Sequence, residues 1–394
     1  MHTCSQINPS KERESHPVQT VDDLKYYLQV AVQLEHATIP PYLTALYSIK
    51  DDAEKSNKAA ADIIRAVAVE EMLHMTLAAN LLNAIGGSPR LTQPKFVPDY
   101  PTYLPTGEED FEAGLHPFSR HTIGTFLNIE RPTPIPETSE SHGMVRLGTG
   151  SHQVHYLPHA RLNETRHAHL ANCLIPPVKQ ANGEDLHFCS IGEFYNAVAQ
   201  GFELLDKEMG HGLFKGDLSR QVGPGIYYSG GGDIVQVEDL ATAQAAIELI
   251  VEQGEANSGR IYDDQQELSH YYRFDQIVKG RYYRVSGDSP GDPQGPEFHV
   301  HWENVYPLFP NAKVRYYLEG SELRRAAEEF NAYYAQFLAF IEEAYNGSPA
   351  KLKDSFTLMF QIKAGASRLI RHPFVHNHFS GTAAPTFEIP GKQL

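Results

Sequence analysis

The chain has 394 residues, 41% of them hydrophobic, and 33 Lys and Arg against 49 Asp and Glu give a formal net charge of −16. This length and hydrophobic content allow a sizeable core and predict two or three domains, unless one helical unit runs long. The acidic balance argues against binding to nucleic acids or anionic membranes, because both need a basic face. We therefore expect neither kind of partner.

The amino-terminal residues and the cysteines bear on the compartment. Residues 1–20 are polar, lack the apolar core of a signal peptide and are interpreted as a disordered arm. No apolar run approaches the roughly 18 residues of a membrane span. The odd and sparse cysteines are not typical of a disulfide framework, which favours a reducing compartment. Together these features predict a cytoplasmic protein.

Two segments near the amino terminus have a helical period of apolar residues, 21–50 and 59–85. Pro40 and Pro41 interrupt the first segment, and because proline lacks an amide donor and clashes with the preceding turn, a kink or a helix restart is expected there. The Gly-Gly-Ser-Pro sequence at 86–89 ends the second segment. A short polar turn joins the two, so an antiparallel helical hairpin is predicted.

Residues 88–186 differ in character, with frequent prolines and no long helical period. A structureless loop of this length would be unusual in a compact domain. We therefore expect an insertion that contains short helices, with 118–130 as one of them, and a few strands, packed over one end of the helical core.

Helical patterns resume after the insertion, over 190–209, 239–253, 263–278 (after a break), 321–345 and 349–369. The sequence thus predicts a mainly α fold. We expect a four-helix bundle over 21–280 that carries the 88–186 insertion, followed by a carboxy-terminal loop and helical extension, 281–394, packed on the bundle.

Polar residues on the apolar faces of the first two helices indicate chemistry. Glu35 lies on the apolar stripe of the first helix, and a buried carboxylate is costly unless it is paired, protonated or bound to metal. Glu71 and His74 are three residues apart on the second helix and therefore share its buried face. Glu70 points to another face and is the weaker candidate. A Glu on one helix and Glu-x-x-His on the next form half the ligand set of a carboxylate-bridged di-metal bundle.

The second pair of helices should supply the other half of such a centre. Glu193 and Glu255 lie at matching heights along the two helices if these are antiparallel. No histidine follows Glu255 at the required spacing, but His270 can return to that height if the chain bulges out after the helix and re-enters. We therefore prefer Glu255 with His270, and keep Glu252 and Glu267 as alternatives.

The predicted metal ligands are thus Glu35, Glu71, His74, Glu193, Glu255 and His270. We expect Glu71 and Glu255 to bridge two ions. Four carboxylates and two imidazoles suit Fe or Mn better than Zn alone, so two iron ions are the first choice, with Mn or Zn as alternatives.

Five sequence blocks resemble the ferritin-like domain of the iminophenyl-pyruvate dimer synthase type, which occurs in violacein- and indolocarbazole-pathway enzymes. The blocks are LEHATIPPYLTALYSI, EEMLHMTLAANLLNAIGG, IGEFYNA, AIELIVEQGEA and SHYYRF. The six predicted ligands lie within them, and Ala256 stands where the family pattern has glycine. The resemblance implies a ferritin-like fold and metal site. It says less about the substrate, because the pathway enzymes are far longer.

Two functions follow as hypotheses. The first is a non-haem di-iron oxidoreductase that uses O₂ on an amino-acid-derived or aromatic small molecule in secondary metabolism, as the resemblance implies. The alternative is metal binding without substrate turnover, in iron sequestration or in an accessory or structural role. Because the insertion would hinder cage packing, we expect a small homo-oligomer at most and not a ferritin cage.

Overall fold

The computed structural model describes residues 17–105, 111–132, 178–179, 185–186, 188, 190–227, 231–255, 261–262, 266–285 and 287–389. These ranges are mainly helical, as predicted. The α-helices are α2 (Val21–Ser48), α3 (Lys58–Ala84), α4 (Arg120–Ile129), α5 (Ile191–Met209), α6 (Leu240–Glu255), α7 (His270–Lys279), α8 (Glu322–Tyr345) and α9 (Lys351–Leu369).

Short elements connect these helices. The 3₁₀ turns are η3 (Gly210–Gly212), η4 (Leu218–Arg220) and η5 (Val314–Tyr316). Two antiparallel strand pairs are described, β1 (Val178–Lys179) with β2 (Asp185–Leu186), and β3 (Pro373–His376) with β4 (Phe379–Thr382).

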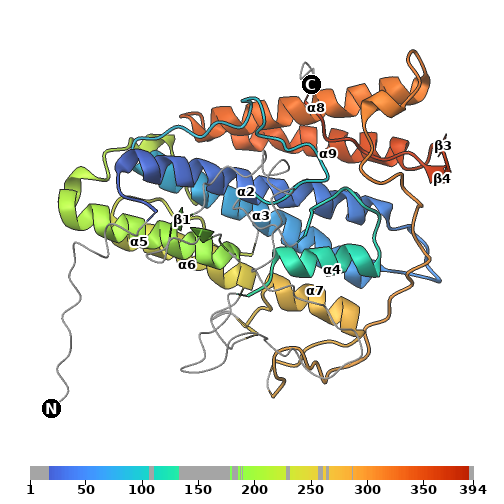
Figure 1. Cartoon of the computed structure of the whole chain (residues 1–394), viewed down its shortest axis with the longest axis horizontal. Coiled ribbons are helices and arrows are strands. Elements are labelled where there is room, and N and C mark those ends of the chain that lie inside the picture. Colours follow the sequence, from blue (N-terminus) through green and yellow to red (C-terminus); the bar gives the residue numbers. More distant parts are fainter. Residues whose placement is uncertain are drawn as a thin grey trace.

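The helices form three layers, with the long antiparallel pair α2 and α3 in the middle (Figure 1). On one side lie two short helical pairs, α5 with α6 and α4 with α7, placed end to end. Helix α2 contacts both α5 and α4, while α3 contacts both α6 and α7. The third position of the four-helix bundle is therefore shared by α4 and α5, and the fourth by α6 and α7.

The first helix begins with a capping box and continues through two prolines. The side chain of Thr20 accepts a hydrogen bond from the Asp23 amide, and the Asp23 carboxylate accepts one from the Thr20 amide. The helix runs unbroken past Pro40 and Pro41, so the expected restart does not occur. Because Pro41 cannot donate to the carbonyl of Ala37, that oxygen needs another donor, and the hydroxyl of Tyr100 supplies it at 2.8 Å.

Serine residues define where several of the shorter helices begin. Ser119, Ser190 and Ser321 accept hydrogen bonds from backbone amides of the first turns of α4, α5 and α8, respectively. Helix α7 ends at Gly280, whose left-handed backbone (φ 70°) suits glycine. The short α4 lies within the predicted 118–130 helix, while α7 begins later than the predicted start at residue 263.

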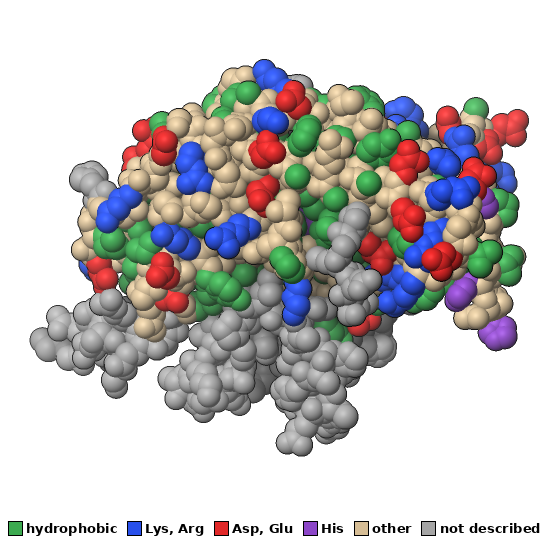
Figure 2. Space-filling model, turned by 90° about the horizontal axis from the view of Figure 1, so that it is seen from above, with side chains coloured by type: hydrophobic (Ala, Val, Ile, Leu, Met, Phe, Trp, Pro, Cys, Tyr) green, Lys and Arg blue, Asp and Glu red, His purple; other side chains and the backbone are tan. Residues whose placement is uncertain are grey.

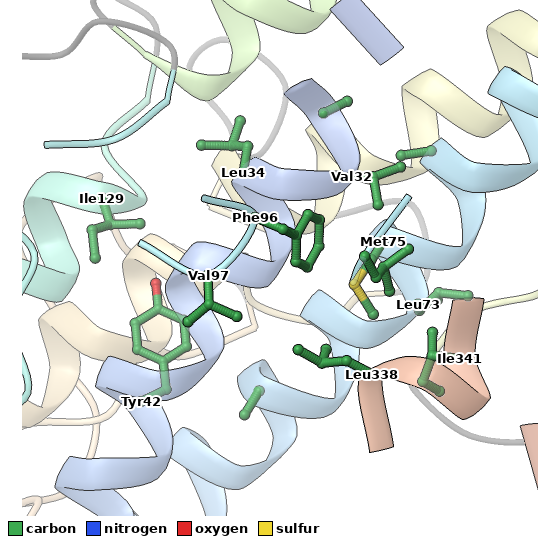
Figure 3. Close-up of a cluster of buried hydrophobic side chains, with 14 of the residues drawn as sticks. Val32, Leu34, Tyr42, Leu73, Met75, Phe96, Val97, Ile129, Leu338 and Ile341 are labelled. Atoms are coloured by element: carbon green, nitrogen blue, oxygen red, sulfur yellow. The ribbon is translucent and has the colours of Figure 1, made fainter. Parts of the chain in front are cut away.

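Helices α8 and α9 form the third layer and pack on the opposite side of α2 and α3 (Figure 1). Figure 3 shows Leu338 and Ile341 of α8 beside Leu73 and Met75 of α3. All four side chains belong to one continuous buried core. Burial of this much apolar surface is the main stabilising contribution to such a fold.

Some predicted features lie outside the described residues. These are most of the 1–20 arm, the three cysteines and much of the 88–186 insertion. Within the insertion, the segment after α3 packs on the bundle, and Phe96 and Val97 enter the core beside α2 (Figure 3).

The surface carries charges of both signs. On the face seen in Figure 2, acidic and basic side chains are interspersed with scattered hydrophobic ones, and the described residues form no extended basic patch there. Among the described residues, no helix has the length and apolarity that crossing a membrane requires.

The hydroxyl of Tyr100 can be tested as the substitute donor in α2. Tyr100→Phe leaves the buried Ala37 carbonyl unsatisfied, and we expect the free energy of unfolding to fall by about 1–3 kcal/mol. Urea unfolding followed by circular dichroism measures this. The control is Tyr26→Phe, at a side chain that is 46% exposed. Equal stabilities for the two variants would contradict this role of Tyr100.

Candidate metal centre

Six polar side chains meet where the two short helical pairs abut against the middle of α2 and α3. The α2–α3 hairpin contributes Glu35, Glu71 and His74. The other three come from helix ends: Glu130 directly follows α4, Glu255 is the last residue of α6, and His270 is the first residue of α7.

The first group of side chains consists of Glu35, Glu71 and His74. The Nδ1 atom of His74 lies 3.6 Å from Oε2 of Glu35 and 3.8 Å from Oε1 of Glu71. One ligand atom from each residue lies within 4.8 Å of the other two. All three side chains are buried. We call this group the His74 half of the centre.

The second group consists of Glu71, Glu130 and His270, and is called the His270 half. The Nδ1 atom of His270 lies 3.0 Å from Oε1 of Glu71 and 3.3 Å from Oε2 of Glu130. The three ligand atoms again lie within 4.8 Å of one another, and all three residues are buried. Glu71 belongs to both halves, and the two imidazole rings stack with centroids 5.4 Å apart.

A small cavity borders both halves. Four carboxylates and one histidine line it on the polar side, namely Glu35, Glu71, Glu130, Glu255 and His74. The remaining lining residues are apolar or glycine: Ile191, Gly192, Ile250, Val251 and Gly254. The cavity lining therefore combines oxygen ligands with apolar residues and glycines of α5 and α6.

Each carboxylate of the cavity accepts a hydrogen bond from a hydroxyl or a backbone amide. Hydroxyls donate to three of them: Tyr195 to Glu35 (2.5 Å), Thr38 to Glu71 (2.8 Å) and Tyr42 to Glu130. The backbone amide of Gly192 donates to Glu255 (2.6 Å). Such outer partners fix the orientation of metal-binding side chains.

The histidines are held in the same manner. The Nε2 atom of His74 lies 2.9 Å from Oε1 of Gln253, and Nε2 of His270 lies 2.7 Å from Oε2 of Glu70. Both Nδ1 atoms therefore face the carboxylates. The buried Nδ1 of His270 makes no hydrogen bond, although it lies close to Glu71. Two imidazoles with one nitrogen engaged outside and the other directed at carboxylates are arranged as metal ligands are.

Crowding of buried charges shifts the protonation of this site. Burial, reinforced by the charges of Glu130 and Glu35, raises the pKa of Glu71 to about 7 despite the opposing effect of His270. Burial alone would lower the pKa of His270, but the surrounding carboxylates raise it well above its usual value. The pKa of His74 is also raised, because hydrogen bonding to Glu35 and the charges nearby outweigh burial.

Glu70 behaves differently from the carboxylates of the cavity. Burial favours its neutral form, but hydrogen bonds and charges from His270 and Arg273 dominate and hold its pKa at about 2. The guanidinium of Arg273 donates to both carboxylate oxygens at 2.8 Å. Glu70 is therefore an ionised partner with its own counter-charge, outside the cluster that lines the cavity.

The charge balance of the cavity fits divalent cations. Four carboxylates line it, each at most 4% exposed, and no Lys or Arg is among the lining residues. Four negative charges with two neutral imidazoles are balanced by two divalent ions. Oxygen ligands with two nitrogens suit Fe or Mn, and the residues present therefore fit a metal pair.

The structure brings together most of the residues predicted from sequence. Glu35, Glu71, His74 and His270 lie in the two groups, and Glu255 lines the cavity. Glu193, the sixth predicted ligand, and the alternatives Glu252 and Glu267 lie outside both groups.

Glu193 is in neither group and does not line the cavity; it lies half-buried in the first turn of α5. Of the two alternatives, Glu267 is half-exposed and paired with Arg273, while Glu252 is absent from both groups. The sequence prediction treated 190–209 as the whole third helix. In the structure α4 and α5 together form the third helix of the bundle. The carboxylate that this helix contributes to the centre is Glu130, which directly follows α4.

Several contributing residues were missed in the sequence. Glu130 follows the buried Ile129 at the end of a short helix that was assigned to the insertion. An acidic residue directly after an apolar helical face was the available signal. Tyr42, Tyr195 and Gln253 gave no signal, because a buried tyrosine or glutamine on a helix is compatible with ordinary packing.

The sequence model of the family described as Ferritin-like matches residues 28–279. The chain belongs to this ferritin-like family. The match covers the helices that carry the site, from α2 to α7, which confirms the ferritin-like bundle predicted from the sequence blocks.

The chain is also similar to two individual proteins. Dichlorochromopyrrolate synthase from Lentzea aerocolonigenes is 25% identical over 439 aligned residues, which cover 98% of this chain and 38% of that protein. The chain thus spans well under half the length of this relative. The crystal structure of a ferritin-like protein from Caulobacter vibrioides is 24% identical, with a TM-score of 0.54, and the similarity covers 89% of this chain and 96% of that one. It supports the fold.

The raised pKa values predict how the metal-free protein responds to pH. Folding holds protons on Glu71, His74 and His270 at pH values where the unfolded chain has released them. Stability from these groups is present at acidic pH and is lost as the pH rises through their folded pKa values. We expect the thermal midpoint of metal-free protein to fall between about pH 5 and pH 8.

Added metal should oppose this loss, because metal binding displaces protons and is favoured at higher pH. The stabilisation by Fe(II) under anaerobic conditions, measured by thermal unfolding, should therefore increase from pH 5.5 to pH 8. Glu71→Gln is expected to flatten the pH profile of the metal-free protein. A midpoint that rises with pH in the metal-free protein would contradict the assigned protonation.

Substitutions can test whether Glu130 or Glu193 is the metal ligand from the third helix of the bundle. Glu130→Ala removes a member of the His270 half and should lower the bound iron from about two ions per chain to about one or fewer. Glu193→Ala should leave the stoichiometry unchanged. Metal analysis after anaerobic loading gives the answer, and loss of iron in the Glu193 variant alone would reverse this assignment.

Proposed function

We propose that the protein is a non-haem di-metal oxidoreductase, with iron as the first choice of metal, that uses O₂ on an amino-acid-derived or aromatic small molecule. The observation that carries this proposal is the pair of buried groups that share Glu71, each with a histidine Nδ1 directed at two carboxylates.

The proposed ligands differ in one position from those predicted by sequence. Glu35 and His74 would hold one ion, Glu130 and His270 the other, and Glu71 would bridge them; Glu255, at the edge of the same cavity, completes the set. Iron bound in this way supplies the O₂ chemistry. The protein's own contribution is to fix the geometry and to keep the reaction out of bulk water.

The outer hydrogen bonds would maintain that geometry. Thr38 donates to Oε2 of Glu71 and leaves Oε1 facing both histidines. Tyr195 and Tyr42 each donate to one oxygen of a terminal carboxylate and so restrict its rotation. Preorganised ligands of this kind need little rearrangement when a reaction occurs.

The apolar lining of the cavity supports a site for turnover. Ile191, Ile250 and Val251 line it together with the carboxylates and two glycines. A mostly apolar lining with a few polar groups is typical of small-molecule sites. The relative that covers nearly all of this chain is named as a synthase, and this supports an enzyme rather than a store of metal.

The test is reconstitution of the full chain with Fe(II) in the absence of O₂, followed by metal analysis and O₂ consumption. We expect about two Fe per chain and O₂ uptake that depends on an added substrate, screened among aromatic amino acids and their 2-oxo acids. Glu71→Ala should abolish both while the helical circular dichroism persists, because it removes the shared ligand.

Other outcomes would overturn the proposal. Iron uptake far above two ions per chain would indicate storage. Absence of bound metal after loading would indicate an accessory protein. Retention of two Fe per chain in the Glu71→Ala variant would show that the ligand assignment is wrong, and Glu193→Ala serves as the matched carboxylate control.

A further inference from the structure

The two halves of the centre share one plan. Each has a terminal carboxylate that accepts a hydrogen bond from a buried tyrosine, Tyr195 or Tyr42. Both halves share Glu71, and each has one histidine. The outer partner of the histidine differs between them: Gln253 for His74 and Glu70 for His270.

The amide of Gln253 determines which nitrogen of His74 carries the proton. Its Nε2 donates to the carbonyl oxygen of Gly231 at 3.2 Å. Because a carbonyl only accepts, the amide oxygen must face His74, whose Nε2 is therefore the donor. In the neutral imidazole that metal binding requires, the lone pair is therefore on Nδ1, facing Glu35 and Glu71. The partner of His74 is thus a neutral amide.

The partner of His270 is an anion. Glu70 accepts from Nε2 of His270 at 2.7 Å and is 4% exposed. It also binds Arg273 with both oxygens, which holds it ionised. A hydrogen bond to an ionised acceptor is stronger than one to a neutral amide. A carboxylate behind a histidine also makes the facing nitrogen a better metal ligand.

Two consecutive glycines of the loop before α6 fit against these two partners. A Cβ atom on Gly231 would lie 2.8 Å from Oε1 of Glu70, and one on Gly232 would lie 3.0 Å from Nε2 of Gln253. Gly231 also has a left-handed backbone (φ 68°). The loop therefore packs against both histidine partners at once, and both are held in place by the same segment.

We infer that the two halves bind metal in a fixed order, the His270 half first and more tightly, because Glu70 is a stronger positioning residue than Gln253. This inference rests on the proposed function only in requiring two metal ions, and it concerns binding alone. Loss of a charged or hydrogen-bonded outer partner costs about 10–100-fold in metal affinity. Because both halves keep an outer partner, the two steps are expected to differ by the lower end of this range, about tenfold.

The experiment is a titration of metal-free full-length protein with Co(II), followed by visible absorption and calorimetry. Two steps should be resolved in the unmodified protein. Glu35→Ala should retain one ion with the affinity of the first step, while Glu130→Ala should retain only the weaker one. This pair identifies which half fills first.

The outer partners are tested by two substitutions with matched controls. Gln253→Leu should weaken the second step about 10–100-fold and leave the first unchanged. Glu70→Gln should weaken the first step by a similar factor. The controls are Gln244→Leu, an exposed position on the same helix, and Glu267→Gln, which removes the other carboxylate on Arg273 without touching His270. Circular dichroism verifies folding of each variant.

The possible results distinguish failure of the fixed binding order from failure of the proposed di-metal centre. Binding of two Co(II) ions in a single step, or in the reverse order, would overturn the fixed order while leaving the di-metal centre intact. Equal weakening of both steps by Gln253→Leu would also refute it. If the unmodified protein binds no Co(II), the proposal of a di-metal centre is refuted as well. Should Glu70→Gln fail to fold, Gln253→Leu and the two ligand variants still decide the order.

Discussion

Four carboxylates buried against one another are the constraint on which this structure depends. Taking a charged group out of water costs several kcal/mol unless a counter-charge or a proton compensates. Among the described residues no basic side chain lines the cavity, and the nearby Arg273 is already paired with Glu70. The raised pKa of Glu71 is the direct consequence in the metal-free protein. The surrounding helices thus hold a cluster of carboxylates whose charge must be compensated by protons or by cations.

The bundle accommodates this cluster by interrupting two of its four helix positions. The amino-terminal ends of α5 and α7 and the carboxy-terminal ends of α4 and α6 meet at the centre. Free amides at helix starts are favourable neighbours for anions, and Gly192 donates to Glu255 in this manner. An uninterrupted helix would hide those amides in its own hydrogen bonds. The breaks therefore supply donors as well as ligands.

The metal-site residues that could be predicted from the sequence are those on helices with a clear apolar periodicity. Glu35, Glu71 and His74 occur on long helices whose apolar period is clear, so their common burial could be inferred from spacing. His270 required the further assumption that the chain leaves and re-enters the bundle. Glu130 was missed because its helix is only ten residues long and is separated in sequence from α5, with which it shares a position. Pairing of distant segments is not encoded in local periodicity.

The positions of the helix breaks also explain how one scaffold accommodates a long insertion. The segment between α4 and α5 begins just after Glu130 and ends just before Ile191, so both of its ends are anchored at the centre. The chain between Glu255 and His270 is anchored there too. Changes in length or sequence within these connections leave the six side chains on their helices. Connecting segments held by a rigid scaffold are where binding specificity usually resides. One helical scaffold is therefore compatible with connections of different length and sequence around the same site.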